Sequence, residues 1–174
     1  MQVWKFGGTS VGKPERMHAI RDLLSNSPGP KIVVLSALSG TTNALLTLGE
    51  LAVGNQDAEA AQKTNELKAH YEAFVQELFK TPEGLAKGKS IIENEFSYVR
   101  SLLTIKPFSV KQEKELVAQG ELLSTQLFTA YLEEQADHCV LLPALEFMRI
   151  DADGEPEMAY IEEKITTLLH QHAD

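Results

Sequence analysis

The sequence predicts an α/β fold interrupted by a long helical insertion, and three observations lead to this class. The first is a strand, helix and strand pattern at the start of the chain. The second is a stretch between residues 44 and 134 in which almost nothing has the pattern of a strand. The third is the return of a strand pattern and a helical pattern near the end. With 174 residues, 43% of them hydrophobic, the chain has the size and composition of one ordinary globular domain.

The opening pattern is the unit from which a parallel sheet is built. Residues 3–6 and 31–36 are short runs rich in β-branched and aromatic side chains, as strands are. Apolar residues recur between them at helical spacing, at Met17, Ile20 and Leu24. Pro14 suits the first turn of this helix, and the breaker-rich residues 25–30 end it. A crossover of this length predicts parallel strands, a right-handed connection and helices on both faces.

The middle of the chain is predicted to be helical. Three amphipathic patterns, each with one apolar face, cover residues 57–80, 82–105 and 109–135. Ser109 and Gln112 have the spacing of a capping box at the start of the last one. Another helix is expected to begin at Ala44, with Asn43 as its cap. Together these helices would form a subdomain over about residues 44–135.

Beyond this subdomain, residues 138–142 have the pattern of a strand and residues 159–170 that of a helix. Cys139 lies in the apolar run and is expected to be a small buried residue. Because it is the only cysteine, an internal disulfide is excluded, which fits a reducing cytoplasm. The sequence Asp151-Ala-Asp153-Gly is too short for a calcium loop and predicts a turn.

Charge and hydrophobicity exclude several classes of partner. The formal net charge is −9, so the chain has no basic surface of the kind that nucleic acids or anionic membranes require. No apolar run approaches the roughly 20 residues that a membrane helix needs, and no signal-peptide pattern opens the chain. We therefore expect a cytoplasmic protein that binds neither nucleic acid nor membrane.

The first stretch that could carry chemistry is VWKFGGTSVGKPERM, residues 3–17. Glycines after a strand, leading into a helix, let backbone N–H groups approach an anion such as phosphate. Gly7, Gly12 and Lys13 nearly match a P-loop, but Pro14 stands where that motif needs a hydroxyl. Lys5 is the other candidate, since a lysine at the carboxyl end of a buried strand can point into a ligand crevice. It could also be a strand residue at a solvated edge.

The second stretch is VVLSALSGTTN, residues 33–43, where an apolar strand again runs into small and hydroxyl side chains. Such residues would line the carboxyl ends of adjacent strands, where open α/β sheets bind ligands. The candidates are Ser36, Ser39, Thr41 and Thr42. A polar loop that merely turns the chain is the alternative.

The third stretch is LVAQGELLST, residues 116–125. Glu121 lies between apolar positions of a helix, and a carboxylate there is rarely buried unless it meets a cation or hydrogen-bond donors. Gly120 costs the helix about 1 kcal/mol relative to alanine, which suggests that something approaches closely. A ligand ammonium would be a fitting partner for Glu121. A solvated glutamate on a helix surface is the alternative.

In this order, and separated by helices, KFGGTSV, VLSALSGTTN and QGELLST resemble the N-terminal part of the aspartate kinases, members of the amino acid kinase family. The resemblance implies an incomplete three-layer α/β/α sandwich of the carbamate kinase-like type with a helical insertion. It also implies transfer of the ATP γ-phosphoryl group to the side-chain carboxylate of L-aspartate. The product, 4-phospho-L-aspartate, begins lysine, threonine and methionine biosynthesis.

The resemblance assigns roles to single residues and favours Lys5 over Lys13. Lys5 would be the catalytic lysine that neutralises charge on the transferring group, and Glu121 would hold the aspartate ammonium. The residues implied for ATP and phosphate binding are Lys5, Gly7, Gly8, Thr9, Ser10 and Ser36. Those implied for the substrate are Thr42, Glu121, Arg149 and Asp153, the last two from a looser match over residues 147–156. No protein residue is expected to bind a metal, because Mg²⁺ would bind with ATP.

The family pattern continues with an Arg-Gly-Gly-Ser-Asp segment, a nucleotide-base pocket and ACT regulatory domains, none of which is found in these residues. We therefore expect residues 1–174 to be the N-terminal part of a single catalytic domain, with little turnover alone. In the complete enzyme we expect L-aspartate and ATP as ligands, and a homo-oligomer. A kinase of a related amino acid such as glutamate, or a non-catalytic partner-binding or regulatory half-domain, are the alternatives.

Overall fold

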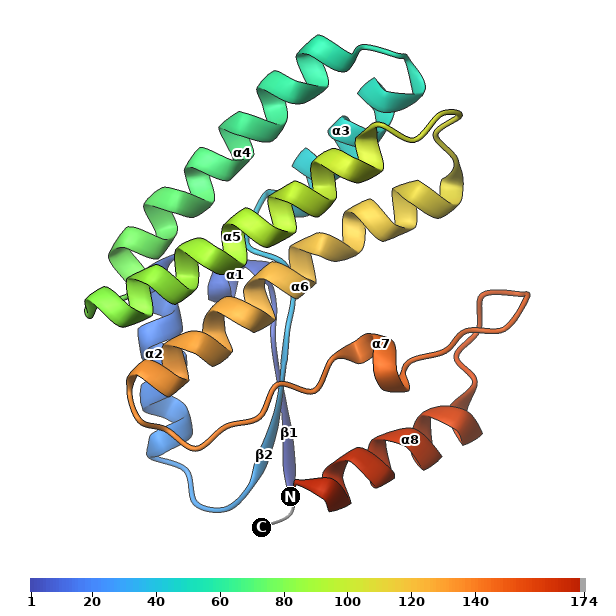
Figure 1. Ribbon diagram of the computed structural model, residues 1–174. Coiled ribbons are helices and arrows are strands. Elements are labelled where there is room, and N and C mark those ends of the chain that lie inside the picture. Colours follow the sequence, from blue (N-terminus) through green and yellow to red (C-terminus); the bar gives the residue numbers. More distant parts are fainter. Residues whose placement is uncertain (173–174) are drawn as a thin grey trace. The chain divides into compact units, whose positions relative to one another are not determined.

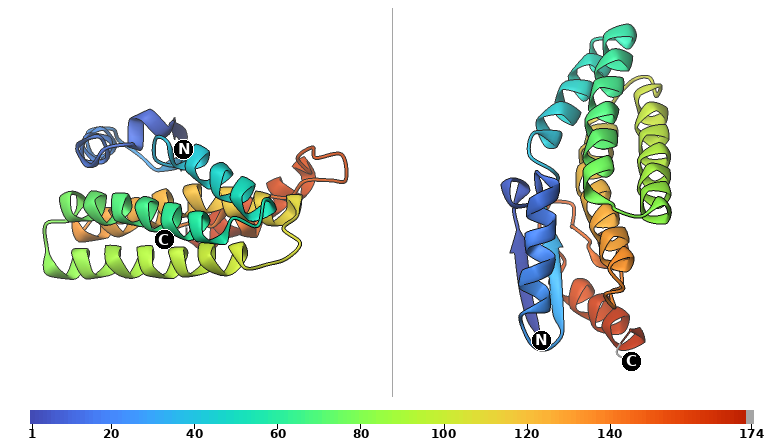
Figure 2. Two further views of the ribbon diagram at one scale, coloured as in Figure 1. Left: turned by 90° about the horizontal axis from the view of Figure 1, so that it is seen from above. Right: turned by 90° about the vertical axis from the view of Figure 1, so that its left-hand side faces the viewer.

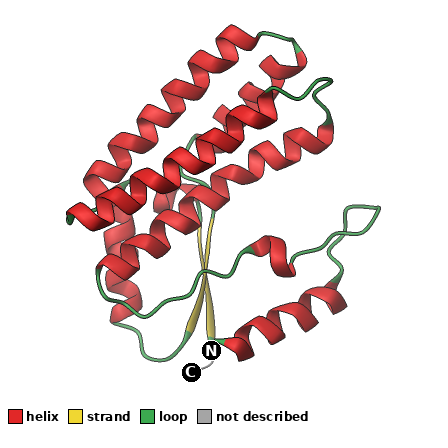
Figure 3. Cartoon of the chain, viewed as in Figure 1, coloured by secondary structure: helices red, strands yellow, loops and turns green. Residues whose placement is uncertain are grey.

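The computed structural model describes residues 1–172 and divides into two compact units. The first unit is Met1–His138, and the second begins at Cys139. Figure 1 labels the elements, and Figure 3 shows the strands of the first unit amid its helices. Within the described residues these strands form one two-stranded sheet. Between residues 1 and 172, no helix combines the length and the apolarity needed to cross a lipid bilayer.

The first unit opens with the predicted strand, helix and strand. Its elements are β1 (Gln2–Phe6), α1 (Gly8–Val11), α2 (Pro14–Ser25) and β2 (Lys31–Leu35). The two strands pair in parallel, with Trp4 opposite Val33 and Phe6 opposite Leu35. Pro14 is in the first turn of α2, where its missing N–H costs nothing. The predicted strands, the helix between them and their parallel pairing are confirmed.

The two faces of this small sheet differ because side chains alternate along each strand. Phe6 and Val33 pack against the main hydrophobic core, and Leu35 is buried in it. On the other face, Val3 is 66% exposed and Val34 is 44% exposed. Lys5 belongs to this second, open face of β1, on the strand that leads into the glycines.

A helical insertion follows β2, as the sequence predicted. It consists of α3 (Thr41–Val53), α4 (Asp57–Leu78), α5 (Pro82–Leu103) and α6 (Val110–Glu134). Figure 2 shows α4, α5 and α6 as long helices that run side by side, with α5 packed against both of the others. Ser109 and Gln112 form the predicted capping box at the start of α6. The α/β class and its helical insertion are thereby confirmed.

The predicted start of α3 was wrong. The helix begins at Thr41, not Ala44, and Asn43 lies inside its first turn. Gly40 is the N-cap residue and adopts a left-handed φ of 87°, which turns the chain into the helix three residues earlier than expected. No side chain caps this helix start.

Two hydrophobic clusters hold the insertion together. The larger joins α2, β2, α4, α5 and α6, and includes Met17, Leu35, Tyr71, Phe96 and Leu127. The smaller anchors α3 to α5 and α6 through Leu45, Leu48, Val99 and Leu116. Each such side chain stabilises the fold by about 1.5–3 kcal/mol when fully buried. The loop before α3 is therefore attached to a rigid helical support.

The second unit contains α7 (Ala144–Phe147) and α8 (Met158–Gln171). α8 confirms the helix predicted over 159–170. The strand predicted at 138–142 was wrong, because within the described residues this apolar segment forms no strand. Apolar composition favours a strand, but a strand also needs a backbone partner that composition does not supply. Cys139 is half-buried, not fully buried as expected.

A tight turn between α7 and α8 confirms another prediction. The carboxylate of Asp151 accepts hydrogen bonds from the backbone N–H groups of Asp153 and Glu155, both at 2.9 Å. Gly154 adopts a φ of 87° at the corner. Asp151 therefore uses its carboxylate to close a turn.

Candidate functional site

Two loops meet at one edge of the sheet, because the carboxyl ends of parallel strands lie together. We call residues 7–12 the glycine loop and residues 36–42 the hydroxyl loop. A Cβ atom on Gly8 would lie 2.9 Å from the carbonyl oxygen of Ala37, and one on Gly12 would lie 2.9 Å from the Cβ of Ser39. Both distances are shorter than side chains tolerate. The two glycines are therefore required for the loops to pack against each other.

Lys5 lies where β1 enters the glycine loop. Its Nζ is 3.4 Å from the position that a Cβ atom on Gly7 would occupy, so the ammonium lies beside the start of the loop. The side chain is exposed, and no ion pair to it forms within residues 1–172. An unpaired ammonium next to glycine backbone is suited to receive an anion.

Lys13 is placed differently. Residues Gly8–Val11 form the short helix α1, so the chain between Gly7 and Lys13 does not form an open loop around a phosphate. Lys13 is the N-cap residue of α2 and is exposed, with Pro14 after it. The geometry therefore supports Lys5, and the P-loop interpretation has no structural support.

The hydroxyl residues of the glycine loop face another direction. Thr9 and Ser10 line a shallow hollow of about 340 Å³ together with Phe6 and residues of α2. The Thr9 carbonyl oxygen accepts a hydrogen bond from the guanidinium of Arg16 on α2. Because Phe6 and Lys5 alternate along β1, this hollow lies on the face of the strand opposite Lys5.

Ser36 joins the two loops to the sheet. Its backbone N–H donates to the carbonyl oxygen of Phe6 at 3.1 Å, which extends the pairing of β1 and β2 by one residue. Ser36 itself is half-buried at the end of β2. It therefore stands at the strand end that the sequence predicted for it.

α6 brings a carboxylate to the hydroxyl loop from 84 residues away in the sequence. Oε1 of Glu121 accepts a hydrogen bond from the backbone N–H of Ala37 at 3.3 Å. A Cβ atom on Gly120 would lie 2.8 Å from the Cβ of Ala37 and 3.2 Å from the Cγ2 of Thr41. The close approach predicted at Gly120 is confirmed, and the group that approaches is the hydroxyl loop. Glu121 itself is exposed.

The hydroxyl loop ends on two threonines with opposite orientations. Thr41 is 1% exposed, and its Oγ1 lies 2.9 Å from the hydroxyl oxygen of Tyr71 on α4. Thr42 is exposed. Consecutive residues of a helix are rotated by about 100°, so an inward Thr41 leaves Thr42 on the accessible side.

Tyr71 is a residue that the sequence did not single out. It lies in the apolar stripe of α4, where its spacing indicates only a core position. Burial raises the pKa of Tyr71, the charge of Glu121 raises it further, and the hydrogen bond with Thr41 lowers it. The phenol therefore stays neutral at neutral pH and can donate a hydrogen bond.

Arg149 and Asp153 belong to the second unit. The guanidinium of Arg149 forms an ion pair with Glu157 and stacks over the ring of Tyr160, 4.1 Å from its centroid. The hydrogen bond that Arg149 donates to the Glu157 carboxylate raises the pKa of Arg149. Asp153 is exposed in the turn that Asp151 closes. Within its own unit, Arg149 is thus already paired with a carboxylate.

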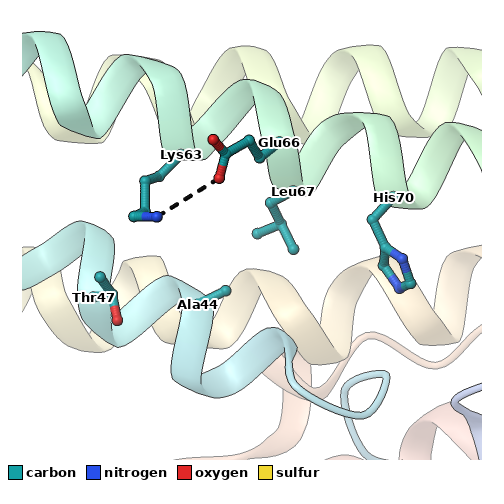
Figure 4. Close-up of a pocket in the computed structure, with 6 residues that line it drawn as sticks. All are labelled: Ala44, Thr47, Lys63, Glu66, Leu67 and His70. Carbon is teal, nitrogen blue, oxygen red and sulfur yellow. Dashed lines mark ion pairs between the residues drawn. The ribbon is translucent and has the colours of Figure 1, made fainter.

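Another hollow, of about 490 Å³, lies between α3 and α4 (Figure 4). Its lining residues are Ala44, Thr47, Lys63, Glu66, Leu67 and His70. The two charged groups pair with each other, because Lys63 Nζ lies 3.6 Å from Glu66 Oε2. None of these residues belongs to either loop, so this hollow is separate from the candidate site.

Comparison with known proteins matches this geometry to one family. The chain is 35% identical over 140 residues to "Aspartokinase 2, chloroplastic" from Arabidopsis thaliana, covering 76% of this chain and 24% of that protein. It is 28% identical over 170 residues to "Lysine-sensitive aspartokinase 3" from Escherichia coli, covering 92% of this chain and 35% of the relative. The chain therefore spans between about a quarter and a third of these relatives.

Solved structures give the same result. A crystal structure of E. coli aspartokinase III in complex with lysine and aspartate superimposes with a TM-score of 0.86 at 28% identity, over 99% of this chain and 38% of that one. A second structure of that enzyme, in complex with aspartate and ADP, gives a TM-score of 0.80 over 97% and 37%. The similarity confirms the predicted fold. The model of the amino acid kinase family matches residues 1–173, and the chain belongs to the amino acid kinase family.

Proposed function

We propose that this chain carries the aspartate-binding side and part of the phosphate-binding side of an aspartate kinase site. The observation that carries the proposal is the approach of α6 to the hydroxyl loop, which places Glu121 against Ala37. The unpaired ammonium of Lys5 lies beside the start of the neighbouring glycine loop. An amino acid with a second carboxylate, and a phosphate donor, are the ligands that these groups suit.

On the substrate side, Glu121 and Thr42 act together. One carboxylate oxygen of Glu121 accepts a hydrogen bond from the N–H of Ala37. The other oxygen can accept hydrogen bonds from the α-ammonium of L-aspartate. The exposed hydroxyl of Thr42 provides a hydrogen bond for orienting the substrate. We propose Arg149 and Asp153 as further substrate contacts. The relatives support this substrate, because they are named aspartokinases and two solved neighbours contain aspartate.

On the phosphate side, the reaction is a transfer of the γ-phosphoryl group. A side-chain carboxylate oxygen of aspartate bonds to the γ-phosphorus, the bond to the bridging oxygen breaks, and ADP leaves with that electron pair. In such a transfer the protein contributes mainly by positioning the reactants and by stabilising charge on the phosphoryl oxygens. Lys5 supplies the charge, and Gly7 and Gly8 allow close approach to the backbone. Ser36 completes the proposed phosphate side, together with Thr9 and Ser10 of the glycine loop, although these two also border the hollow on the other face of β1.

Mg²⁺ would enter this site on the phosphate oxygens of ATP. Within residues 1–172, no group of three or more His, Cys, Asp or Glu side chains is placed to hold a metal ion. Mg²⁺ commonly binds to substrate phosphates and few protein ligands, so these residues are compatible with it. We further propose that residues 1–174 form part of a single catalytic domain, in a cytoplasmic enzyme that is a homo-oligomer.

Calorimetric titration of the 174-residue chain tests the substrate. We expect L-aspartate to bind more tightly than L-glutamate, because the relatives are named aspartokinases and two solved neighbours contain aspartate. Glu121→Gln should weaken aspartate binding by roughly tenfold or more, because a charged hydrogen bond to the ammonium is lost. Glu50→Gln is the matched control, since Glu50 is an exposed glutamate of α3. Equal binding of both amino acids, or an unaffected Glu121→Gln variant, would contradict the proposal.

A further inference from the structure

A buried phenol at the base of the candidate site has no part in the chemistry proposed above. Tyr71 on α4 is fully buried, and its ring contacts Phe96 edge-on at a centroid distance of 5.8 Å. Its hydroxyl oxygen lies 2.9 Å from Oγ1 of Thr41, which is also buried. Two buried hydroxyls that pair across 30 residues of sequence satisfy each other and leave a single favoured geometry.

The threonine of this pair is held from two sides. Its hydroxyl hydrogen-bonds with that of Tyr71. Its Cγ2 packs against Gly120 of α6, where an added Cβ atom would lie only 3.2 Å from it. The start of α3 has no side-chain cap, and Gly40 before it adopts a left-handed φ of 87°. The contacts of Thr41 therefore fix the start of α3 to α4 and α6.

Both proposed substrate residues are chain neighbours of the groups in this contact. Thr42 follows Thr41, and Glu121 follows Gly120. A rotation or shift of Thr41 would therefore move the Thr42 hydroxyl relative to the Glu121 carboxylate. Tyr71 is also close enough to Glu121 for the charge of that carboxylate to raise the pKa of the phenol, although burial is the larger cause.

We propose that Tyr71 is a positioning residue for the aspartate side of the site. Its hydroxyl fixes Thr41 and thereby sets the distance and direction of Thr42 relative to Glu121. This inference rests on the proposed function, since aspartate is the ligand that Thr42 and Glu121 are proposed to hold. The helical insertion thus helps to position the substrate, because the Tyr71 hydroxyl belongs to α4.

The substitution Tyr71→Phe tests this role, since it keeps the ring in the core and removes only the hydroxyl. In the 174-residue chain we expect aspartate affinity, measured by calorimetry, to fall by roughly fivefold, the effect of one neutral hydrogen bond. Thr41→Val should have the same effect, and the double variant should be no worse than either single one. Thr41→Ser keeps the hydroxyl and should retain the affinity. Tyr98→Phe removes the hydroxyl of an exposed tyrosine and is the control.

Amide hydrogen exchange separates positioning from stability. In Tyr71→Phe we expect faster exchange at Ala37 and Ala44, whose N–H groups bond to Glu121 and Gly40, and unchanged exchange at Ile92 in the middle of α5. A fall in the unfolding temperature with unchanged aspartate affinity would overturn the proposal and leave Tyr71 a core residue.

The same experiment distinguishes the two proposals. If the unsubstituted chain binds no aspartate, the proposed function fails. The exchange rates at Ala37 and Ala44 then decide alone whether Tyr71 positions the loop. Unchanged rates at both amides in Tyr71→Phe would overturn the positioning role, whatever the ligand.

Discussion

At the level of single residues, the proposed phosphate side of the site depends on Lys5, whose ammonium has no carboxylate partner within the described chain. Lys5 lies on the open face of β1, two residues after Val3, and its Nζ lies beside Gly7. Lys13, six residues from Gly7, is separated from it by α1. The two lysines have the same charge but different backbone surroundings, so they can be compared directly.

Replacing Lys5 by Met should weaken binding of Mg-ATP by roughly tenfold, because one charged contact to phosphate is lost while the aliphatic stem is kept. Lys13→Met is the matched control and should bind Mg-ATP as the unsubstituted chain does. Fluorescence or calorimetric titration of both variants measures the effect. A loss confined to Lys13→Met would favour the P-loop interpretation and contradict ours.

At the level of elements, the site exists because α6 and the hydroxyl loop come into van der Waals contact. Gly120 makes this possible, since a side chain there would meet Ala37 at 2.8 Å. Gly49 on α3 provides a comparison, because it is also a buried helix glycine but a Cβ atom there would have its nearest neighbour at 3.5 Å. Alanine substitutions at the two positions therefore distinguish two effects: the cost of glycine to helix stability, and the need for close packing at Gly120.

Gly49→Ala should raise the free energy of unfolding by up to about 1 kcal/mol, the gain in helix propensity. Gly120→Ala should instead lower it by about 1–3 kcal/mol, because overpacking exceeds that gain, and should also weaken aspartate binding. Denaturant unfolding and calorimetry of both variants check this. If Gly120→Ala were as stable as Gly49→Ala and bound aspartate normally, the contact would have no role in forming the site.

The elements also show which predictions local sequence supports. β1, α2, β2 and the capping box of α6 were predicted because their signals lie within a few residues of one another. The cap at Asn43 was wrong because a left-handed Gly40 can start a helix without a side chain. The strand at 138–142 was wrong because strand formation depends on a backbone partner.

The site was predictable in part for the same physical reason. Loops after parallel strands must share an edge, so the meeting of the glycine and hydroxyl loops followed from the strand pattern. The glycine in α6 indicated a close approach, but not which group would approach. Tyr71 could not be found, because an apolar stripe shows that a tyrosine is buried and not which oxygen it meets.

At the level of the whole molecule, the residues proposed for the site come from both units. The first unit contains Lys5, both loops and Glu121, and the second contains Arg149 and Asp153. The helical insertion supports the aspartate side through α3, α4 and α6. We propose that L-aspartate binds where Glu121 meets the hydroxyl loop.

Titration of the ¹⁵N-labelled chain with L-aspartate, followed by NMR, tests this claim most directly. We predict saturable shifts that are largest at the amides of Ala37, Thr42, Gly120 and Glu121, and that need roughly tenfold more L-aspartate to saturate in Glu121→Gln. Shifts at Arg149 and Asp153 would add the second unit to the site. Shifts centred instead on the hollow between α3 and α4, or no shifts at saturating aspartate, would contradict the account.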